Sequence, residues 1–374
     1  MIPFCKPSIT ALETQYLLEA AHERICGDGP FTERATQLFK EKTGLDRALM
    51  TTSCTHALEL AAILSDVMPG DEVILPSFTF SSTANAFLLR GATLRFCEIE
   101  PGTMNVDVCH MDSLINKKTK VLVPVDYAGV PADIDPIREL AHRHDLLIIE
   151  DAAQAVGSRY KGRPAGSDAD FSCFSFHETK NYVMGEGGIL YIKNPELEKH
   201  AEIIREKGTD RSRFYRGEVD KYTWQRSGSS FLPSDILAAM LCGQLERFDE
   251  ILSKRMHIWN SYYTCLASLE KAGKLTRPFV PDYAEHNAHI FFIMLNTADE
   301  RDELLAFLRA KGIGAVFHYI PLHSAPAGIA AGNKSGDLPL TEEYSARLLR
   351  LPLFPDLTES EIQHIVSSVH AYFS

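Results

Sequence analysis

The sequence lacks the closely spaced cysteines that mark a metal site. Its eight cysteines are scattered, and no Cys-x-x-Cys motif occurs among positions 5, 26, 54, 97, 109, 173, 242 and 265. This spacing argues against zinc, and a disulfide framework is untypical of a chain of 374 residues. We therefore expect no metal and free cysteines, most of them small buried side chains in a reducing compartment.

Positive charge and long apolar runs are also scarce. The 38 lysines and arginines are outnumbered by 50 aspartates and glutamates, which gives a formal net charge of −12. This balance excludes a broad nucleic-acid-binding face but is compatible with a local basic pocket for a phosphorylated ligand. No segment approaches the length of a membrane span, and the N-terminus has no basic start. We expect a cytoplasmic protein with no nucleic-acid or membrane partner.

Short apolar strands alternate with helical segments through the first half of the chain. This alternation predicts an α/β fold with a mostly parallel sheet covered on both faces. The strands are expected at 72–75, 93–98, 120–125, 146–150, 171–176 and 188–193. Helices are expected at 11–25, 33–43, 56–67, 83–90, 135–144 and 196–207.

The C-terminal part has a different pattern. One long helix is expected at 234–269, followed by a smaller α+β unit with strands at 287–295 and 313–318 and helices at 299–311, 341–350 and 358–372. We predict a large domain of 1–233, a linking helical region of 234–276 and a small domain of 277–374. Arginines are interleaved with aromatics in the polar stretch 208–230. We predict that this stretch is a long surface loop, and a loop of this length is more often functional than not.

Lys180 is the most informative residue because of its surroundings. It lies between the apolar strand 171–176 and a glycine-rich turn at 185–188, and Asp151 ends another apolar run about 30 residues earlier. A strand-tip acid and a lysine suit pyridoxal phosphate (PLP): the lysine forms a Schiff base and the acid pairs with the ring nitrogen. Considered alone, Lys180 would be a solvated lysine. For Asp151 the alternative is a helix N-cap for 152–156, but its position at the end of a strand favours the functional interpretation.

Two further segments fit the same cofactor. The hydroxyls of 53–55 precede a predicted helix, whose first amides form a ready phosphate site, although the same residues also suit an ordinary N-cap. Phe80 follows a predicted strand and could stack on a flat ring, although a core aromatic is the default. His142 and His144 are two residues apart on a helix and do not share a face, which argues against a metal pair.

Together these motifs resemble the DegT/DnrJ/EryC/StrS family of sugar-nucleotide aminotransferases. The resemblance runs nearly end to end and rests on 53–55, 76–80, 150–154 and 175–181. It implies PLP fold type I, the aspartate aminotransferase fold. Segments 177–182, 205–209 and 317–323 resemble most closely the enzymes that form dTDP-4-amino-4,6-dideoxygalactose for enterobacterial surface polysaccharides, lipopolysaccharide and enterobacterial common antigen among them.

The resemblance also implies roles for single residues. Lys180 holds PLP, Asp151 pairs with the pyridine nitrogen, and Gln154 contacts the ring hydroxyl. Phe80 stacks on the ring, and the phosphate is held by Cys54, Thr55 and Ser175. The family forms homodimers with shared active sites, in which the partner chain reaches the phosphate; many relatives use an asparagine where this chain has Ser230. The candidate substrate contacts are Glu186, Arg211, His318 and Tyr319. The stretch 208–230, which contains Arg211, is our candidate for binding the diphosphate or base through its arginines and aromatics. A structural histidine is an equally good interpretation of His318.

The implied reaction moves the amino group of L-glutamate to the 4-keto carbon of dTDP-4-keto-6-deoxyglucose and releases 2-oxoglutarate. The gluco epimer or another nucleotide ketosugar are the nearest alternatives. A PLP-dependent 3-dehydratase would carry a histidine in place of Lys180. A non-catalytic relative would not need to keep Lys180, Asp151 and Gln154 together.

Overall fold

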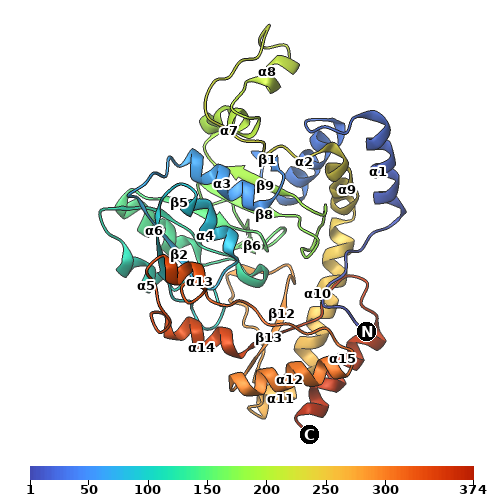
Figure 1. Cartoon of the computed structure of the whole chain (residues 1–374). Helices are drawn as coiled ribbons and strands as arrows, with labels where there is room; N and C mark the ends of the chain where they lie inside the picture. Colours follow the sequence, from blue (N-terminus) through green and yellow to red (C-terminus); the bar gives the residue numbers. More distant parts are fainter.

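The computed structural model describes all 374 residues, and a seven-stranded sheet forms its centre (Figure 1). The strand order is β1-β9-β8-β5-β4-β2-β3. The strands from β3 to β8 are parallel, whereas β9 runs antiparallel to both β1 and β8. The predicted α/β sheet is confirmed. Its strands are β1 (Ala48–Thr51), β2 (Glu72–Pro76), β3 (Thr93–Cys97), β4 (Thr119–Leu122), β5 (Leu147–Asp151), β8 (Phe171–Ser175) and β9 (Gly188–Ile192).

Helices cover both faces of this sheet, so its inner strands are apolar on both sides. Successive residues of β2 show the alternation: Val73 and Leu75 pack on one face and Ile74 on the other. The first face carries α3 (Cys54–Leu64), α4 (Ser81–Leu88) and α7 (Glu198–Arg205). The second carries α2 (Pro30–Thr43), α5 (Val108–Leu114), α6 (Ile134–His144) and α9 (Asp235–Glu246), and α1 (Ala11–Glu23) packs on α9.

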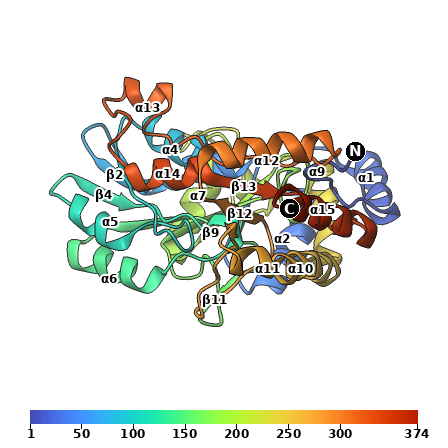
Figure 2. The same cartoon turned by 90° about the horizontal axis from the view of Figure 1, so that it is seen from below.

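A smaller antiparallel sheet is built from the C-terminal part of the chain. Its order is β10-β12-β13, and α12 lies beside it (Figure 2). The short strand β11 (Ala284–Glu285) pairs instead with β6 (Arg159–Tyr160), which also pairs with β7 (Arg163–Pro164). The remaining elements are η1 (Tyr127–Gly129), η2 (Pro195–Leu197), α8 (Arg211–Tyr215), α10 (Phe248–Cys265), α11 (Ala267–Lys271), β10 (Leu275–Thr276), β12 (Phe291–Leu295), α12 (Ala298–Ala310), α13 (Pro326–Ala330), α14 (Pro339–Arg347), β13 (Leu348–Leu351) and α15 (Glu359–Tyr372).

Three sequence predictions need correction here. The strand expected at 313–318 is absent, and only isolated bridges form at Ile313 and Val316. The helix expected at 341–350 ends at Arg347, and β13 follows it, because a run of leucines fits a buried strand as well as a helix. The helix expected at 234–269 breaks at Arg247, where the backbone has φ −94 and ψ 18. The domain limits at 233 and 276 stay a prediction.

None of the helices combines the length and the apolar character that crossing a membrane requires.

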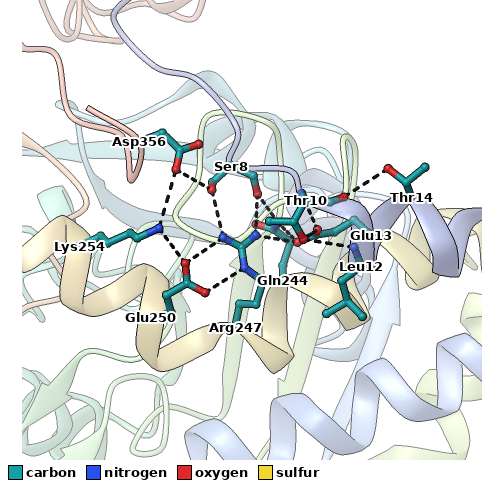
Figure 3. A network of polar contacts seen from close by, with 10 residues as sticks. All are labelled: Ser8, Thr10, Leu12, Glu13, Thr14, Gln244, Arg247, Glu250, Lys254 and Asp356. Carbon is teal, nitrogen blue, oxygen red and sulfur yellow. Dashed lines mark hydrogen bonds and ion pairs between the residues drawn. The ribbon is translucent and has the colours of Figure 1, made fainter. Parts of the chain in front are cut away.

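A buried polar network joins the N-terminal segment to the break between α9 and α10 (Figure 3). Glu13 is fully buried and accepts hydrogen bonds from Thr10, from Gln244 at 2.7 Å and from Arg247 at 3.0 Å. Arg247 also pairs with the half-exposed Glu250 at 3.1 Å. Burial alone would raise the pKa of Glu13, but the bonds from Thr10 and Arg247 outweigh it, so that the pKa is lowered.

Replacement of Glu13 by glutamine should destabilise the protein by about 3–5 kcal/mol, because it removes one partner of a buried ion pair. The measurement is urea unfolding at neutral pH. Because the pKa of Glu13 is lowered, the advantage of the wild type should shrink as the pH falls through that pKa. Glu250→Gln, which removes the exposed partner of the same arginine, should cost less than about 1 kcal/mol. Equal effects of the two substitutions would contradict this account.

Candidate active site

The candidate residues gather at one edge of the large sheet. The parallel strands β2, β5 and β8 all end there, so the chain delivers Phe80, Asp151 and Ser175 to neighbouring positions. The carboxyl edge of a parallel sheet is the usual place for a ligand in α/β folds. The strands thus bring together residues that lie up to 95 positions apart in the sequence.

Lys180 lies beside Asp151 in the loop between β8 and β9. Its amide donates to the carbonyl of His177 at 2.9 Å, and its side chain is half-buried. Burial lowers the pKa of Lys180, and the nearby Cys54 and Asp151 only partly oppose this. In turn, the charge of Lys180 lowers the pKa of Asp151 against the raising effect of burial. Lys180 and Asp151, which are predicted to flank one cofactor, are therefore close enough for the charge of each to shift the pKa of the other.

Asp151 is a buried carboxyl group with no ion pair. It is 5% exposed, Thr83 donates to its Oδ2 at 2.6 Å, and the amide of Ala153 donates to its Oδ1 at 3.2 Å. Burial raises its pKa and these two bonds lower it, with a net rise. A buried charge is costly without a partner. The N–H of a protonated pyridine would be such a partner.

Gln154 is held in place on both sides. The amide of Ala128 donates to its Oε1 at 2.7 Å, and its Nε2 donates to the hydroxyl of Tyr319 at 3.2 Å. Ala128 has φ 59, a left-handed conformation that is unusual for alanine and aims its N–H at Gln154. This arrangement fixes the Gln154 side chain one turn from Asp151.

The start of α3 forms an anion cradle. Ser53 caps the helix by accepting from the amide of His56 at 3.1 Å, and the first amides of a helix have no acceptor within it. The amides of Cys54 and Thr55 are therefore available to a phosphate. Gly188 allows the close approach of β9, because a Cβ there would lie 2.5 Å from the Cys54 nitrogen. The Thr55 hydroxyl bonds that of Ser82 at 2.7 Å.

Aromatic side chains form one wall of the site. Phe80, at the N-terminus of α4, is 60% exposed, which is unusual for a large apolar side chain next to buried groups. The ring of Tyr319 lies 6.4 Å from it. The Nδ1 of His318 and the hydroxyl of Tyr127 are 3.2 Å apart, and burial, with Arg350 and Lys180, holds the pKa of His318 well below its usual range. A flat ring bound here would cover Phe80.

Comparison with known proteins identifies the family to which this chain belongs. Residues 7–370 match the DegT/DnrJ/EryC1/StrS aminotransferase family. The chain belongs to this family. It is 33% identical over 373 residues to GDP-perosamine synthase of Caulobacter vibrioides, covering 98% of this chain and 97% of that protein. It is 32% identical over 376 residues to the spore coat polysaccharide biosynthesis protein SpsC of Bacillus subtilis, covering 98% of this chain and 96% of that protein.

Solved structures agree with this assignment. The aminotransferase TlmJ of Streptoalloteichus hindustanus superposes with a TM-score of 0.91 at 30% identity, covering 100% of this chain and 99% of that one. The PLP form of the putative sugar aminotransferase Spr1654 of Streptococcus pneumoniae gives 0.92 at 27% identity, covering 99% and 98%. The protein is therefore a PLP-dependent aminotransferase of this family. The unpaired Asp151, the exposed ring of Phe80 and the amides at α3 all fit this cofactor.

Other predicted contacts of this aminotransferase lie in the arm 208–230 and in the loop between β8 and β9. Ser230 is exposed and its backbone pairs with Glu206, at the base of the arm formed by 208–230 (Figure 1). Arg211 bonds Glu206 at 3.1 Å and Tyr215 at 2.8 Å within that arm. The exposed Glu186 lies 3.6 Å from His177. The roles predicted for Ser230, Arg211 and Glu186 stay predictions.

Two residues of the site were missed by sequence reasoning. The hydroxyl of Thr83, which supports Asp151, comes from three consecutive hydroxyl residues after Phe80, a signal that could have been noticed. Arg350 on β13 gave no signal, because it lies 170 positions from Lys180. Its Nε is buried without a partner, it makes no ion pair, and its charge lowers the pKa of Lys180.

Thr83→Val should weaken PLP binding roughly tenfold, because it removes a hydrogen bond to a charged group while keeping the shape of the side chain. The pKa of Asp151 should then rise further, because the hydroxyl of Thr83 lowers it. The measurement is a fluorescence titration of the cofactor-free protein with PLP. Thr83→Ser keeps the donor and should bind PLP as the wild type does. If the valine and serine variants bound PLP equally well, the hydroxyl would have no such role.

Proposed function

We propose that the protein transfers the amino group of L-glutamate to the 4-keto carbon of dTDP-4-keto-6-deoxy-D-glucose. The products are 2-oxoglutarate and dTDP-4-amino-4,6-dideoxygalactose, a precursor for surface polysaccharide. The observation that carries the aminotransferase part is the convergence of Lys180, Asp151 and Gln154 on one sheet edge. The segments that resemble the galactose-forming enzymes carry the substrate part.

Lys180, Asp151 and Gln154 have different roles in the proposed reaction. Bound PLP supplies an aldehyde and an electron sink. Lys180 would hold the cofactor through its amine and would move a proton to and from the carbon that bears the transferred nitrogen. Its lowered pKa favours the free amine that this task needs. Asp151 would keep the nitrogen of the PLP ring protonated, and Gln154 would orient the ring through a contact to the ring hydroxyl.

Binding of the rest of the cofactor is assigned to three groups. Phe80 would stack on the cofactor ring, since the Phe80 side chain is 60% exposed. Cys54 and Thr55 hold the phosphate through their amides and the Thr55 hydroxyl. Ser175, whose hydroxyl accepts from the amide of His177 at 3.4 Å, holds the phosphate from the end of β8.

Both substrates are anions, and the site offers cationic and polar groups for them. His318 and Tyr319 line the site beside Gln154 and are our candidates for contacts to the sugar. Arg350 is a cation without a counter-ion next to Lys180, which supports an anionic donor such as glutamate. Arg211 is assigned to the diphosphate or base from the arginines and aromatics of 208–230, and Glu186 is a further candidate for a substrate contact.

The relatives support a nucleotide-sugar substrate and a role in polysaccharide synthesis. One relative is a GDP-perosamine synthase and another a spore coat polysaccharide biosynthesis protein. The nucleotide named in the first differs from dTDP, so GDP-linked and UDP-linked ketosugars belong in the same test. The gluco epimer of the product is the second candidate, because the face of protonation sets the configuration.

We also propose a homodimer with shared active sites. The arm 208–230 exposes Phe214, Tyr215, Tyr222 and Trp224, the last at 78%. An exposed cluster of this kind is typical of a protein interface. Docking on a second copy would place Ser230, at the base of the arm, next to the partner's phosphate site.

The reaction is tested by incubating the protein with PLP, L-glutamate and dTDP-4-keto-6-deoxyglucose, and by determining the product configuration by NMR. We expect the galacto product and a visible cofactor band that glutamate bleaches. Lys180→Ala should lower turnover by more than about 10³-fold, because it removes the group that moves the proton. Turnover of Lys180→Ala at the wild-type rate, or a stable band in the presence of glutamate, would exclude this function. Lys193→Ala, outside the site, is the matched control.

Mixed dimers test the shared site. Lys180→Ala and Ser230→Arg chains should each be inactive alone, the second because the arginine blocks the partner's phosphate contact. Refolded together, they should regain about one quarter of wild-type activity, because half the dimers are mixed and each mixed dimer has one intact site. If Ser230 served the site of its own chain, the mixture would stay inactive. Sedimentation should show a dimer, and Trp224→Asp should shift it towards monomer.

A further inference from the structure

Two further buried acids, Asp126 and Glu150, lie next to Asp151. Asp126 is 0% exposed and Glu150 is 3% exposed. Glu150 precedes Asp151 in β5 and so points to the opposite face of the strand. The amide of Asp126 donates to the carbonyl of Asp151 at 3.1 Å. We call Asp126 and Glu150 the acid pair.

Each member of the acid pair has one oxygen with a backbone donor and one without. The amide of Ala132 donates to Oδ1 of Asp126, and the amide of Gly166 donates to Oε1 of Glu150, both at 2.9 Å. Oδ2 of Asp126 and Oε2 of Glu150 are buried and receive no N–H or hydroxyl bond. Neither acid forms an ion pair.

The two side chains shift each other's pKa, which places their carboxyl groups close together. An ionised carboxylate can only accept a hydrogen bond, so a bond between the two groups would need a proton on one of them. Burial raises the pKa of both acids, and that of Glu150 reaches about 7. Two ionised carboxylates in contact without a cation would be strongly disfavoured.

The surroundings do not supply a compensating positive charge. Asp168 raises the pKa of Glu150 but is itself paired with Arg163 at 2.8 Å. The titratable groups that face the acid pair are Asp151, Asp168 and the phenol of Tyr283. The proton that the pair retains is therefore what limits the buried negative charge at this place.

The acid pair also joins the two segments that carry the ring contacts. Glu150 sits on β5 next to Asp151, whereas Asp126 begins the loop 126–130, whose Ala128 amide orients Gln154. The hydroxyl of Ser158 further ties the loop down through the Gly129 carbonyl at 2.7 Å. A bond between the two acids would link the strand that presents Asp151 to the loop whose Ala128 amide binds Gln154.

We propose that the acid pair holds one shared proton and acts as a positioning element, which clamps loop 126–130 to the end of β5 and fixes Asp151 and Gln154 for the PLP ring. Loss of the proton places two anions in contact, pushes the loop from the strand and loosens the cofactor. The proposal rests on the PLP dependence of the enzyme and not on its sugar substrate or amino donor.

Amide substitutions test the shared proton. In Asp126→Asn the amide oxygen can keep the Ala132 bond while its NH₂ donates to Oε2 of Glu150, and Glu150→Gln does the same in reverse. Each single variant should bind PLP as tightly as the wild type at about pH 6. The double variant sets two NH₂ groups against each other and should bind PLP at least about tenfold more weakly. A double variant equal to the single variants would overturn the proposal.

The pH dependence supplies a second test that a purely structural role would not pass. Between about pH 6 and about pH 9 the dissociation constant of PLP should rise roughly tenfold more in the wild type than in Asp126→Asn. Asp145→Asn, which removes an exposed carboxyl group just before β5, should follow the wild type. Parallel profiles of wild type and Asp126→Asn would overturn the proposal.

Thermal unfolding of the full chain freed of PLP gives a readout without the cofactor. Because the pKa of Glu150 is raised from 4.5 to about 7, the native state keeps a proton that the unfolded state loses in this window. Stability of the wild type should therefore fall as the pH rises from 4.5 to about 7. Glu150→Gln should reduce this slope, to which the raised pKa of Asp126 also contributes, and a slope unchanged in the variant would place the proton elsewhere.

Discussion

The architecture of the site depends on one buried negative charge that the protein does not neutralise by itself. Asp151 receives two hydrogen bonds and senses Lys180, yet its pKa is still raised by burial. A carboxyl group in this state is costly unless a cationic ligand arrives. In the role that we propose for Asp151, a protonated ring nitrogen would complete this site, and the energy of that pairing would contribute to cofactor binding.

The order of the strands explains how the reactive lysine reaches this acid. Parallel strands β5 and β8 end at the same edge, and β9 starts from that edge because it is antiparallel to β8. The loop that joins β8 to β9 must then pass over the edge, and Lys180 lies in it. The return path is possible only because Gly188 allows β9 to pass next to the amide of Cys54. One antiparallel strand thus places the lysine, the acid and the phosphate cradle together.

Local sequence patterns were sufficient for the parts of the site that neighbouring residues define. Asp151 ends an apolar strand and Lys180 precedes a glycine-rich turn, and both signals lie within a few residues. Thr83 and Arg350 were missed because their partners are distant: Thr83 bonds a residue 68 positions away. The acid pair was missed because the sequence does not show that these two acids are buried with no cation near them. The misassigned residues 348–350 have the same origin, since only pairing with β12 makes Leu348–Leu351 a strand.

The arm 208–230 shows how charge and exposure can suggest different roles for one segment. Its arginines were expected to grip the diphosphate, but Arg213 pairs with Glu218 at 3.0 Å and Arg216 with Glu202 at 2.6 Å. Exposed pairs of this kind contribute little, so an arginine can leave its partner for a phosphate at small cost. The exposed aromatics have no comparable alternative within the chain, since Trp224 stays 78% exposed. Burying Trp224 would release apolar surface from water, so the aromatics, more than the arginines, argue that the arm docks on protein.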